Sequence, residues 1–284
     1  MTSSFGQHTD GKPDYRRYDR GAAPVVAMAI DYASGHATPT HQHPQAQLLH
    51  AVRGVMVVGS RHGQWIVPPT RGIWIPAGTE HVVRMVGAVH MRTAFIRTDA
   101  APGLPTECAV IGISPLLREL IIAALDIAPP YADDSRDGRL MKLLLDELRT
   151  LPTLPLHLPE PDDARLRPIC ATLARTPDDP RTAAQWSRAL GIDPRTLHRR
   201  FVRATGMGYA QWRQQARLLQ ALERLAGGAR VLDVALSLGY GSPSAFATMF
   251  KRQFGITPSA FFETPDEAPW PRRGARRPAG KARA

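Results

Sequence analysis

The sequence predicts a multidomain α and β protein, in which an N-terminal β-barrel with a helical pair precedes a C-terminal all-α domain with two helix-turn-helix motifs. Three observations support this fold class. Short segments rich in Val, Ile and aromatic residues fill the chain from about residue 25 to residue 97. The segment Pro194–Gly206 recurs as Pro243–Gly255, at an offset of 49 residues. The excess of positive charge lies around this repeat and beyond it.

The N-terminal segments have the composition and spacing of β-strands. Glycine, proline and short polar turns separate them, which is typical of a sandwich or a barrel. We expect seven strands, with the sequences VVAMAI, AQLLHAV, GVMVVGS, GQWIVP, RGIWIPA, HVVRMV and MRTAFIR.

Two motifs in this region carry polar groups placed for chemistry. The first, H-x-H-x3-Q-x6-G, begins at His41 and includes His43 and Gln47. The second, G-x3-P-x-G-x2-H, ends at His81. His41 and His43 are two residues apart, so on a strand both point to one face. Neutral imidazoles that converge with His81 could hold a divalent metal ion.

This region, roughly residues 25–97, resembles the cupin fold, a small β-barrel whose two motifs carry such histidines and glycines. The cupin metal site normally has a glutamate where this chain has Gln47, and the loss of a charged ligand weakens metal binding. Three interpretations stay open for His41, His43 and His81. They form a divalent metal site, a polar patch at the barrel mouth for a small organic ligand, or a patch with no ligand. We expect no required cofactor.

Two amphipathic segments follow the barrel. Ser114–Ala128 begins with a Ser cap and a proline, and Arg136–Leu151 has leucines at helical spacing. They predict an antiparallel helical pair with more apolar surface than packing on one barrel edge needs. The pair either covers the barrel or forms a dimer contact, and we favour a homodimer. The proline-rich segment Leu151–Asp163 predicts a semi-rigid linker.

Each copy of the repeated segment predicts the second helix of a helix-turn-helix. Asp193 and Ser242 precede the prolines as N-caps, and a glycine would end each helix. A short helix and a glycine turn lie ahead of each copy, and in the first copy Thr182 has capping-box spacing. A long helix from about Tyr209 to Ala226 joins the two units. If their separation is one duplex turn, ~34 Å, both recognition helices enter successive major grooves on one DNA face.

The charge distribution indicates the partner. The net charge is +11, and residues 1–161 are neutral overall, whereas residues 162–263 carry 15 Lys and Arg against 8 Asp and Glu. A localised basic surface is typical of a DNA-binding protein. No segment approaches the roughly 18 apolar residues of a membrane span, and the first residues lack the apolar core of a signal peptide. Two cysteines provide no disulfide framework. We therefore expect a cytoplasmic protein with no membrane partner.

The C-terminal region, from about residue 162 to residue 263, resembles the DNA-binding domain of the AraC/XylS family of bacterial transcription regulators. The resemblance rests on DPRTLHRRFVRATG from Asp193, RLLQALERL from Arg217, VALSLGY from Val234 and SPSAFATMFKRQFGITP from Ser242. A cupin-like sensing domain ahead of it is the common architecture of that family. The resemblance implies a sequence-specific regulator, not an enzyme, that responds to a small molecule in its barrel. The alternative is a cupin-type metal-dependent enzyme with an appended DNA-binding module.

The resemblance also implies roles for single residues. Base-reading positions fall on Arg195, His198 and Arg199 in the first recognition helix, and on Ser244, Ala245 and Thr248 in the second. Arginine can bond guanine bidentately, whereas the short side chains of the second helix offer no bidentate partner. We therefore expect the first helix to supply most direct discrimination, and the second to rely on phosphate contacts and DNA shape. The expected DNA-backbone contacts are Thr182, Arg200, Arg203, Ser242, Lys251 and Arg252.

The expected domain division follows from these segments. It comprises a flexible arm (residues 1–22), a cupin-like barrel (23–110), a helical pair (111–150), a linker (151–163), a double helix-turn-helix domain (164–263) and a disordered basic tail (264–284). The expected partners are double-stranded promoter or operator DNA, a small-molecule effector and a second copy of the chain.

Overall fold

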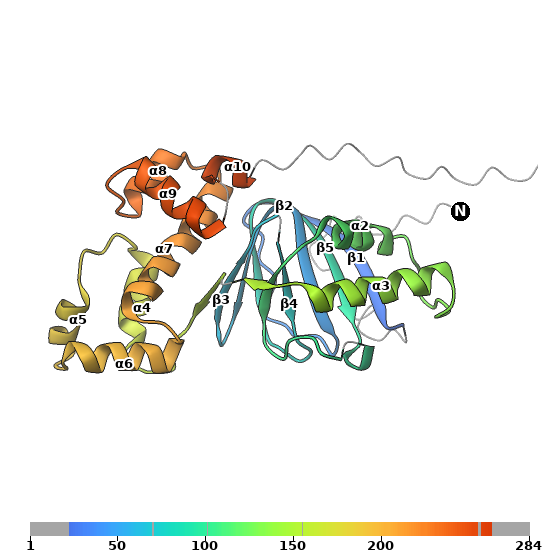
Figure 1. Cartoon of the computed structure of the whole chain (residues 1–284), viewed down its shortest axis with the longest axis horizontal. Helices are drawn as coiled ribbons and strands as arrows, with labels where there is room; N and C mark the ends of the chain where they lie inside the picture. Colours follow the sequence, from blue (N-terminus) through green and yellow to red (C-terminus); the bar gives the residue numbers. More distant parts are fainter. Residues whose placement is uncertain (1–22, 70, 101, 155, 255–256, 263–284) are drawn as a thin grey trace, which may run out of the picture.

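The computed structural model describes residues 23–262, apart from residues 70, 101, 155, 255 and 256. The arm expected over residues 1–22 and the basic tail expected over residues 264–284 lie outside the described residues. Figure 1 shows two parts side by side: a sheet flanked by two helices, and a group of helices at one end of it.

The N-terminal part is built on one antiparallel sheet. Its strand order is β1-β5-β2-β4-β6-β7, and β3 pairs with both β2 and β8. The strands are β1 (Val25–Tyr32), β2 (Ala46–Ser60), β3 (Gly63–Val67), β4 (Arg71–Ile75), β5 (Val82–Ile96), β6 (Ala109–Gly112), β7 (Thr153–Leu154) and β8 (His157–Pro159). A single 3-10 turn, η1 (Thr98–Ala100), follows β5.

The sheet is not the closed barrel that we expected. Within the described residues β1 and β7 are the two ends of the strand order, and no pairing joins them. The reason lies in β2, which branches the sheet: its residues 47–50 pair with β4 and its residues 56–60 pair with β3. The wider prediction of a sheet-rich N-terminal part and an all-helical C-terminal part is confirmed.

Two of the breaks that we expected between strands are irregularities inside longer strands. β2 and β5 each run for 15 residues, through Gly54 and Gly87 respectively. The ladder between them shifts register around Arg53, and Gly54 has a left-handed φ of 76°. A Cβ on Gly54 would lie 2.5 Å from the carbonyl oxygen of Ala88. Glycine at residue 54 therefore permits a close crossing of two backbones instead of a turn.

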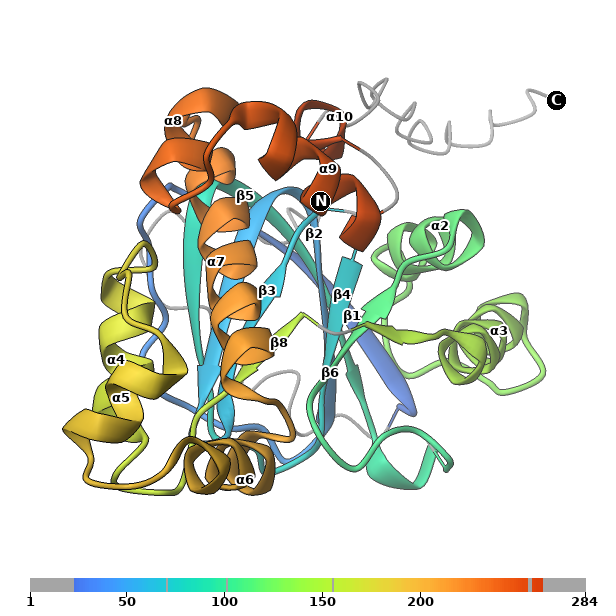
Figure 2. The ribbon, with the colours of Figure 1, turned by 60° about the vertical axis from the view of Figure 1, so that its left-hand side comes forward.

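The helical pair covers one face of the sheet (Figure 2). It consists of α2 (Pro115–Ala124) and α3 (Arg136–Thr150), and the Ser114 hydroxyl caps α2 by accepting from the amide of Leu117 at 3.0 Å. Side chains such as Leu117, Leu144 and Leu148 are buried against the sheet, which confirms the covering role. Leu116 and Leu143 face outward, with 47% and 43% of their surface exposed.

The C-terminal part is all-helical and is arranged around α7. Its helices are α4 (Arg167–Arg175), α5 (Ala183–Ala189), α6 (Pro194–Thr205), α7 (Tyr209–Ala226), α8 (Val231–Ser237), α9 (Pro243–Phe254) and α10 (Pro258–Phe262). α7 has the bounds that the sequence predicts, and it contacts helices of both helix-turn-helix units as well as strands β2, β3 and β5. Figure 2 shows α7 running between the two groups of helices.

The proline-rich segment between the two parts contributes strands to the sheet edge. β7 pairs with β6, and β8, which ends in Pro159, pairs with β3. Proline is tolerated on such an edge strand. The indole Nε1 of Trp212 in α7 donates to the carbonyl oxygen of Pro159 at 3.0 Å, and Trp212 is 1% exposed. This contact ties the long helix to the segment that leads into it.

Two composition-based expectations can be compared with the described residues. Cys108 and Cys170 are free, and burial raises the pKa of both thiols, so neither is a ready nucleophile. In the part of the chain that the structure describes, none of the helices combines the length and apolar character needed to cross a bilayer.

Candidate nucleic-acid interface and histidine cluster

The first recognition helix, α6, is defined at both ends by local chemistry. The Asp193 carboxylate accepts from the amide of Thr196 at 2.9 Å and from its hydroxyl at 2.6 Å. These two bonds, the hydroxyl first, hold the pKa of Asp193 below its usual range. Gly206 ends the helix with a φ of 72°, and no atom lies within 4 Å of the position a Cβ would take. The predicted cap and stop are thus confirmed.

The apolar and polar faces of α6 separate the core from the candidate base readers. Leu197 and Phe201 are fully buried against the rest of the domain. Arg195, His198 and Arg199 are exposed, which places all three base-reading candidates on the solvent side. A major-groove helix needs its base-reading side chains on its exposed face.

One expected phosphate contact in α6 already has an intramolecular partner. The Arg200 Nη1 lies 2.6 Å from Asp163 Oδ2, with 35% and 20% of the two side chains exposed. Asp163 also accepts from the amide of Arg165 at 2.9 Å, and that bond leads in lowering the pKa of its carboxyl group. Arg203 is exposed on the same helix. The sequence offered no signal for the Arg200–Asp163 pair, because its members are distant along the chain.

The second recognition helix, α9, repeats this construction with smaller polar groups. The Ser242 hydroxyl accepts from the amide of Ala245 at 3.1 Å, which confirms the predicted cap, and Phe246 and Phe250 are fully buried. Ser244, Ala245 and Thr248 are exposed, as are Lys251 and Arg252 in the last turn.

The two N-cap hydroxyls expected at the DNA backbone are both engaged in caps. Thr182 accepts from the amide of Gln185 at 3.3 Å and donates its own amide to the Gln185 side chain at 2.7 Å, a complete capping box. Ser242 accepts in the same way. In each case the hydroxyl uses its oxygen, so its hydrogen can still be donated to a phosphate.

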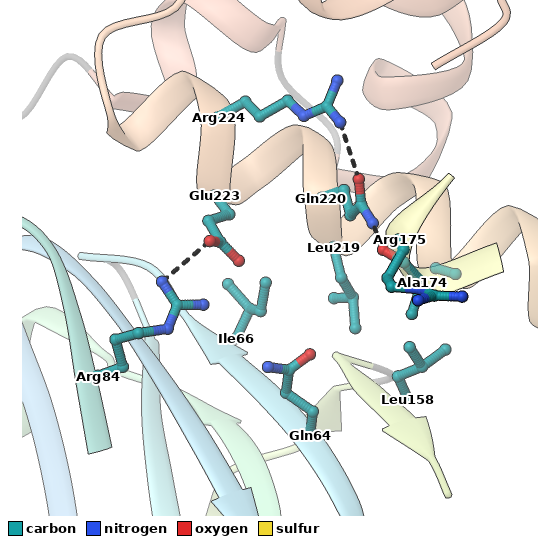
Figure 3. Close-up of a pocket in the computed structure, with 11 residues that line it drawn as sticks. Gln64, Ile66, Arg84, Leu158, Ala174, Arg175, Leu219, Gln220, Glu223 and Arg224 are labelled. Carbon is teal, nitrogen blue, oxygen red and sulfur yellow. Dashed lines mark hydrogen bonds and ion pairs between the residues drawn. The ribbon is translucent and has the colours of Figure 1, made fainter. Parts of the chain in front are cut away.

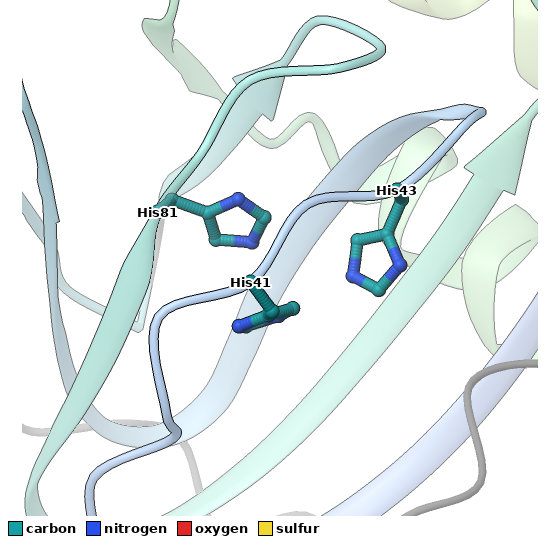
Figure 4. Close-up of side chains that lie close together, drawn as sticks. All are labelled: His41, His43 and His81. Atoms are coloured by element: carbon teal, nitrogen blue, oxygen red, sulfur yellow. The ribbon is translucent and has the colours of Figure 1, made fainter.

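In the sheet domain, three predicted histidines lie together (Figure 4). His41 and His81 form an isolated bridge through two backbone hydrogen bonds of 3.0 and 2.8 Å. Their ring centroids are 4.4 Å apart, and the His43 ring lies 5.0 Å from His41 and 5.7 Å from His81. One ligand atom from each ring lies within 4.8 Å of those of the other two.

Burial favours the neutral form of two of the three rings, those of His43 and His81. Burial first, and the neighbouring imidazoles after it, lower the pKa of His43 and of His81 to about 4. Gln47, the fourth predicted residue, is buried on β2, where its Nε2 donates to the Thr93 hydroxyl at 3.2 Å. The structure thus gathers the three histidines and places Gln47 on the neighbouring strand.

The contact between the two domains was not predicted. The Arg84 guanidinium of β5 lies 2.9 Å from the Glu223 carboxylate of α7, and both residues line a cavity of about 430 Å³ (Figure 3). The cavity lies between the sheet and helices α4 and α7. Its lining residues include Gln64, Ile66 and Leu158 from the sheet and Arg175, Leu219 and Arg224 from the helices.

A second cavity, of about 780 Å³, also spans the two parts. One wall holds Gln42, Thr79 and Glu80, which adjoin the clustered histidines along the chain. Another wall holds Ala204 and Thr205 at the end of α6. The sheet domain therefore meets the first recognition helix across a solvent-accessible space.

Comparison with known proteins agrees with this architecture. The family model of the AraC-like ligand binding domain matches residues 23–151, and that of a helix-turn-helix domain matches residues 186–264. The HTH-type transcriptional regulator NimR of Escherichia coli (strain K12) is 35% identical over 244 residues, which are 86% of this chain and 89% of NimR. The HTH-type transcriptional activator RhaS of Yersinia pestis (strain Pestoides F) is 40% identical over 65 residues, 22% of this chain and 24% of RhaS.

Two solved structures align with this chain at lower sequence identity. A crystal structure of ToxT from Vibrio cholerae O395 aligns with a TM-score of 0.35 at 11% sequence identity, over 84% of this chain and 97% of that chain. A DNA-binding transcriptional dual regulator from Escherichia coli K-12 aligns with a TM-score of 0.32 at 24% identity, over 36% of this chain and 92% of that chain.

A ligand-binding sheet domain followed by a helix-turn-helix domain defines a DNA-binding transcription regulator. Its relatives are transcription regulators, and none of these findings supports the enzyme alternative. The chain belongs to the AraC family of transcription regulators.

Proposed function

We propose that this regulator reads its operator with two recognition helices that enter adjacent major grooves, α6 first and α9 second. The observation that carries the proposal is the repeated unit held at both ends of α7. This helix has 18 residues, so at 1.5 Å per residue it is about 27 Å long and stiff. Its length is of the order of one duplex turn, about 34 Å.

Direct base reading falls mainly to α6 in this proposal. Arg195 and Arg199 each offer the planar fork that matches guanine O6 and N7, and His198 offers a ring N–H. Their exposure, opposite the buried Leu197 and Phe201, supports the assignment.

The α9 helix then contributes a smaller share of sequence discrimination. Thr248 can bond one base edge and Ala245 can touch a thymine methyl group, while Ser244 adds one hydroxyl. Phosphate contacts come from Thr182, Arg200, Arg203, Ser242, Lys251 and Arg252. These contacts position the helices and make binding salt-dependent.

The remaining features of the proposal concern assembly and control. We assign a sheet domain to residues 23–110, a helical pair to 111–150, a linker to 151–163 and the DNA-binding domain to 164–263. The outward Leu116 and Leu143 on the helical pair support a homodimer contact there. A small-molecule effector bound by the N-terminal domain controls the regulator, which acts in the cytoplasm and catalyses no reaction.

The test is selection of binding sites from a random duplex pool by the full-length protein at physiological salt. Two enriched elements about one helical turn apart support reading by both helices. An Arg199→Ala variant should then lose enrichment at one position within the first element. Binding that shows no enrichment and collapses as salt rises would reduce the domain to an electrostatic anchor and overturn the proposal.

A further inference from the structure

We propose that His41, His43 and His81 bind one divalent transition metal ion of the zinc, nickel and cobalt class, and that this ion is an effector of the regulator. The effector role rests on the function proposed above, whereas the metal site stands on the geometry of the cluster alone. The sequence alone leaves the metal as one of three interpretations, because Gln47 stands where a charged ligand is usual. The arrangement of the three rings favours the metal.

The backbone brings the three rings together. The reciprocal hydrogen bonds between His41 and His81 fix the two segments side by side, and His43 follows two residues later. Two nitrogens bound to one zinc ion at about 2.1 Å lie at most about 4.2 Å apart. The observed limit of 4.8 Å between ligand atoms therefore leaves only a small side-chain rotation before all three can bind one ion.

Backbone carbonyl groups fix the tautomers of the His41 and His81 rings. Nδ1 of His41 lies 2.8 Å from the carbonyl oxygen of Pro39, and Nδ1 of His81 lies 2.8 Å from that of Thr79. A carbonyl oxygen can only accept, so in each neutral ring Nδ1 carries the hydrogen and Nε2 keeps its lone pair. Metal-binding histidines show this pattern, in which a backbone carbonyl fixes the tautomer and orients the ring.

The Nε2 atom of His81 is a buried acceptor without a donor among the described residues. His81 is 2% exposed, and among the described residues its Nε2 has no hydrogen-bond partner. A buried acceptor without a donor costs free energy, and a bound cation would recover it.

The donor set selects the metal class. Imidazole suits zinc, nickel, copper and iron, whereas magnesium and calcium prefer oxygen. The described cluster contains no carboxylate or thiolate, so the bound ion keeps its full charge and binds less tightly than in a charged cage. Moderate, exchangeable binding suits a signal better than a resident cofactor.

Gln47 is the neighbour that could complete the coordination. It is the register partner of Phe95, whose ring lies 4.9 Å from the His43 ring. Its Oε1 is buried and has no hydrogen-bond partner among the described residues, while Thr93 holds its amide nitrogen. A neutral carbonyl oxygen from Gln47 or a water molecule would fill the position that a carboxylate does not.

The same segments offer a route from the metal to DNA. Gln42 lies between His41 and His43, and Thr79 and Glu80 precede His81. All three line the cavity of about 780 Å³, which is also lined by Ala204 and Thr205 at the end of α6. An ion that ties these two segments together stiffens the wall that faces the first recognition helix. The ion would thereby alter the positions that the DNA-binding domain can adopt.

The experiment uses full-length protein without a polyhistidine tag, titrated with Co²⁺ while its visible absorption is recorded. We expect one equivalent of Co²⁺ to give the absorption of a nitrogen-ligated site, and an excess of Zn²⁺ to remove it. His81→Ala and His41→Ala should each weaken Co²⁺ binding by at least about tenfold, since each removes a ligand. His62→Ala is the matched control, because its ring is exposed and lies outside the cluster.

Operator affinity with and without Zn²⁺ then tests the effector role. We expect Zn²⁺ to change the affinity of the wild type and of His62→Ala by at least about fivefold, but not that of His41→Ala. Folding of each variant is checked by circular dichroism, and His41→Ala carries the test if His81→Ala unfolds, since His41 is only half-buried.

The outcomes separate the two proposals. No Co²⁺ binding, or binding that both substitutions leave unchanged, overturns the metal site. Specific metal binding with unchanged operator affinity overturns the effector role. A protein that selects no operator, with or without metal, contradicts the proposed function and leaves the Co²⁺ result intact.

Discussion

Releasing Arg200 from Asp163 should tighten operator binding. In the free protein the Arg200 guanidinium lies 2.6 Å from the Asp163 carboxylate, so a phosphate must compete with this pair. In the wild type, the Asp163 carboxylate accepts a hydrogen bond from the amide of Arg165 at 2.9 Å. Asp163→Asn removes the negative charge but keeps a side-chain oxygen that can accept the same bond. The local turn should therefore survive the substitution.

The size of the effect follows from the exposure of the pair. Side chains that are 35% and 20% exposed are partly screened, which places the pair near the upper end of the range for surface ion pairs, about 1 kcal/mol. In the wild type, breaking this ion pair to release Arg200 opposes DNA binding by that free energy, and in the variant there is no ion pair to break. The dissociation constant should therefore fall about fivefold.

The assay is fluorescence anisotropy with a selected operator over a range of salt concentrations. Asp162→Asn is the matched control, because Asp162 is exposed and adjacent and removes the same charge. Asp163→Asn should bind the operator about fivefold more tightly than Asp162→Asn does. This difference in affinity should disappear when both variants also carry Arg200→Ala. Arg200→Ala alone should reduce the salt slope by about 0.9. Equal affinities for the two Asn variants, or an unchanged slope in Arg200→Ala, would refute the competition.

Four further substitutions, and the dependence of stability on pH, test other features of the structure. Arg199→Ala should cost about 1–3 kcal/mol at one operator position, whereas Lys251→Ala should weaken all sequences alike and reduce the salt slope by about 0.9. Gly206→Ala should destabilise the protein by about 1 kcal/mol, because Gly206 has a φ of 72° with open space around it. Gly54→Ala should cost about 1–3 kcal/mol more than Gly206→Ala, because a Cβ at residue 54 would lie 2.5 Å from the Ala88 carbonyl oxygen. Denaturant unfolding measures both glycine variants. Burial lowers the pKa of His50 from about 6.5 in the unfolded chain to about 4 in the folded protein. The free energy of unfolding should therefore be at its full value above pH 6.5 and should decrease as the pH falls toward 4. At pH 5 the loss should be about 2 kcal/mol.

Each of these expectations has a contrary result. Uniform weakening of all duplexes by Arg199→Ala would remove that residue from base reading. Equal costs for the two glycine variants would mean that the strand crossing at Gly54 relaxes freely. For His50, which Arg92 and Arg118 face and whose Nδ1 bonds the Arg71 carbonyl, a His50→Asn variant with the same pH dependence as wild type would contradict the titration.

Features set by neighbouring residues were predictable from the sequence. The caps at Asp193, Thr182 and Ser114 and the full length of α7 follow from side chains within four residues, and all are confirmed. The gathering of His41, His43 and His81 was predictable from the pair of motifs, although His41 and His43 precede β2 and do not lie on a strand as the period-two argument assumed.

Features set by distant pairing were not predictable. Gly54 looks like a turn when read locally, yet the partner strand keeps β2 continuous through it. The branching of β2 between β3 and β4, which leaves the sheet open, depends on registers that no single segment encodes. Arg84 and Glu223 each look like ordinary surface charges, and only the packing of α7 on the sheet brings them together.

The helix α7 has a consequence for how such genes can change. One added codon within it would turn everything downstream by about 100° and shift it by about 1.5 Å. The α9 helix would then leave the duplex face that α6 reads, and Glu223 would rotate away from Arg84. Insertions and deletions in this stretch should therefore be eliminated by selection. Operator preference should instead diversify through point changes at exposed residues of α6, such as Arg195 and His198, which carry little of the fold.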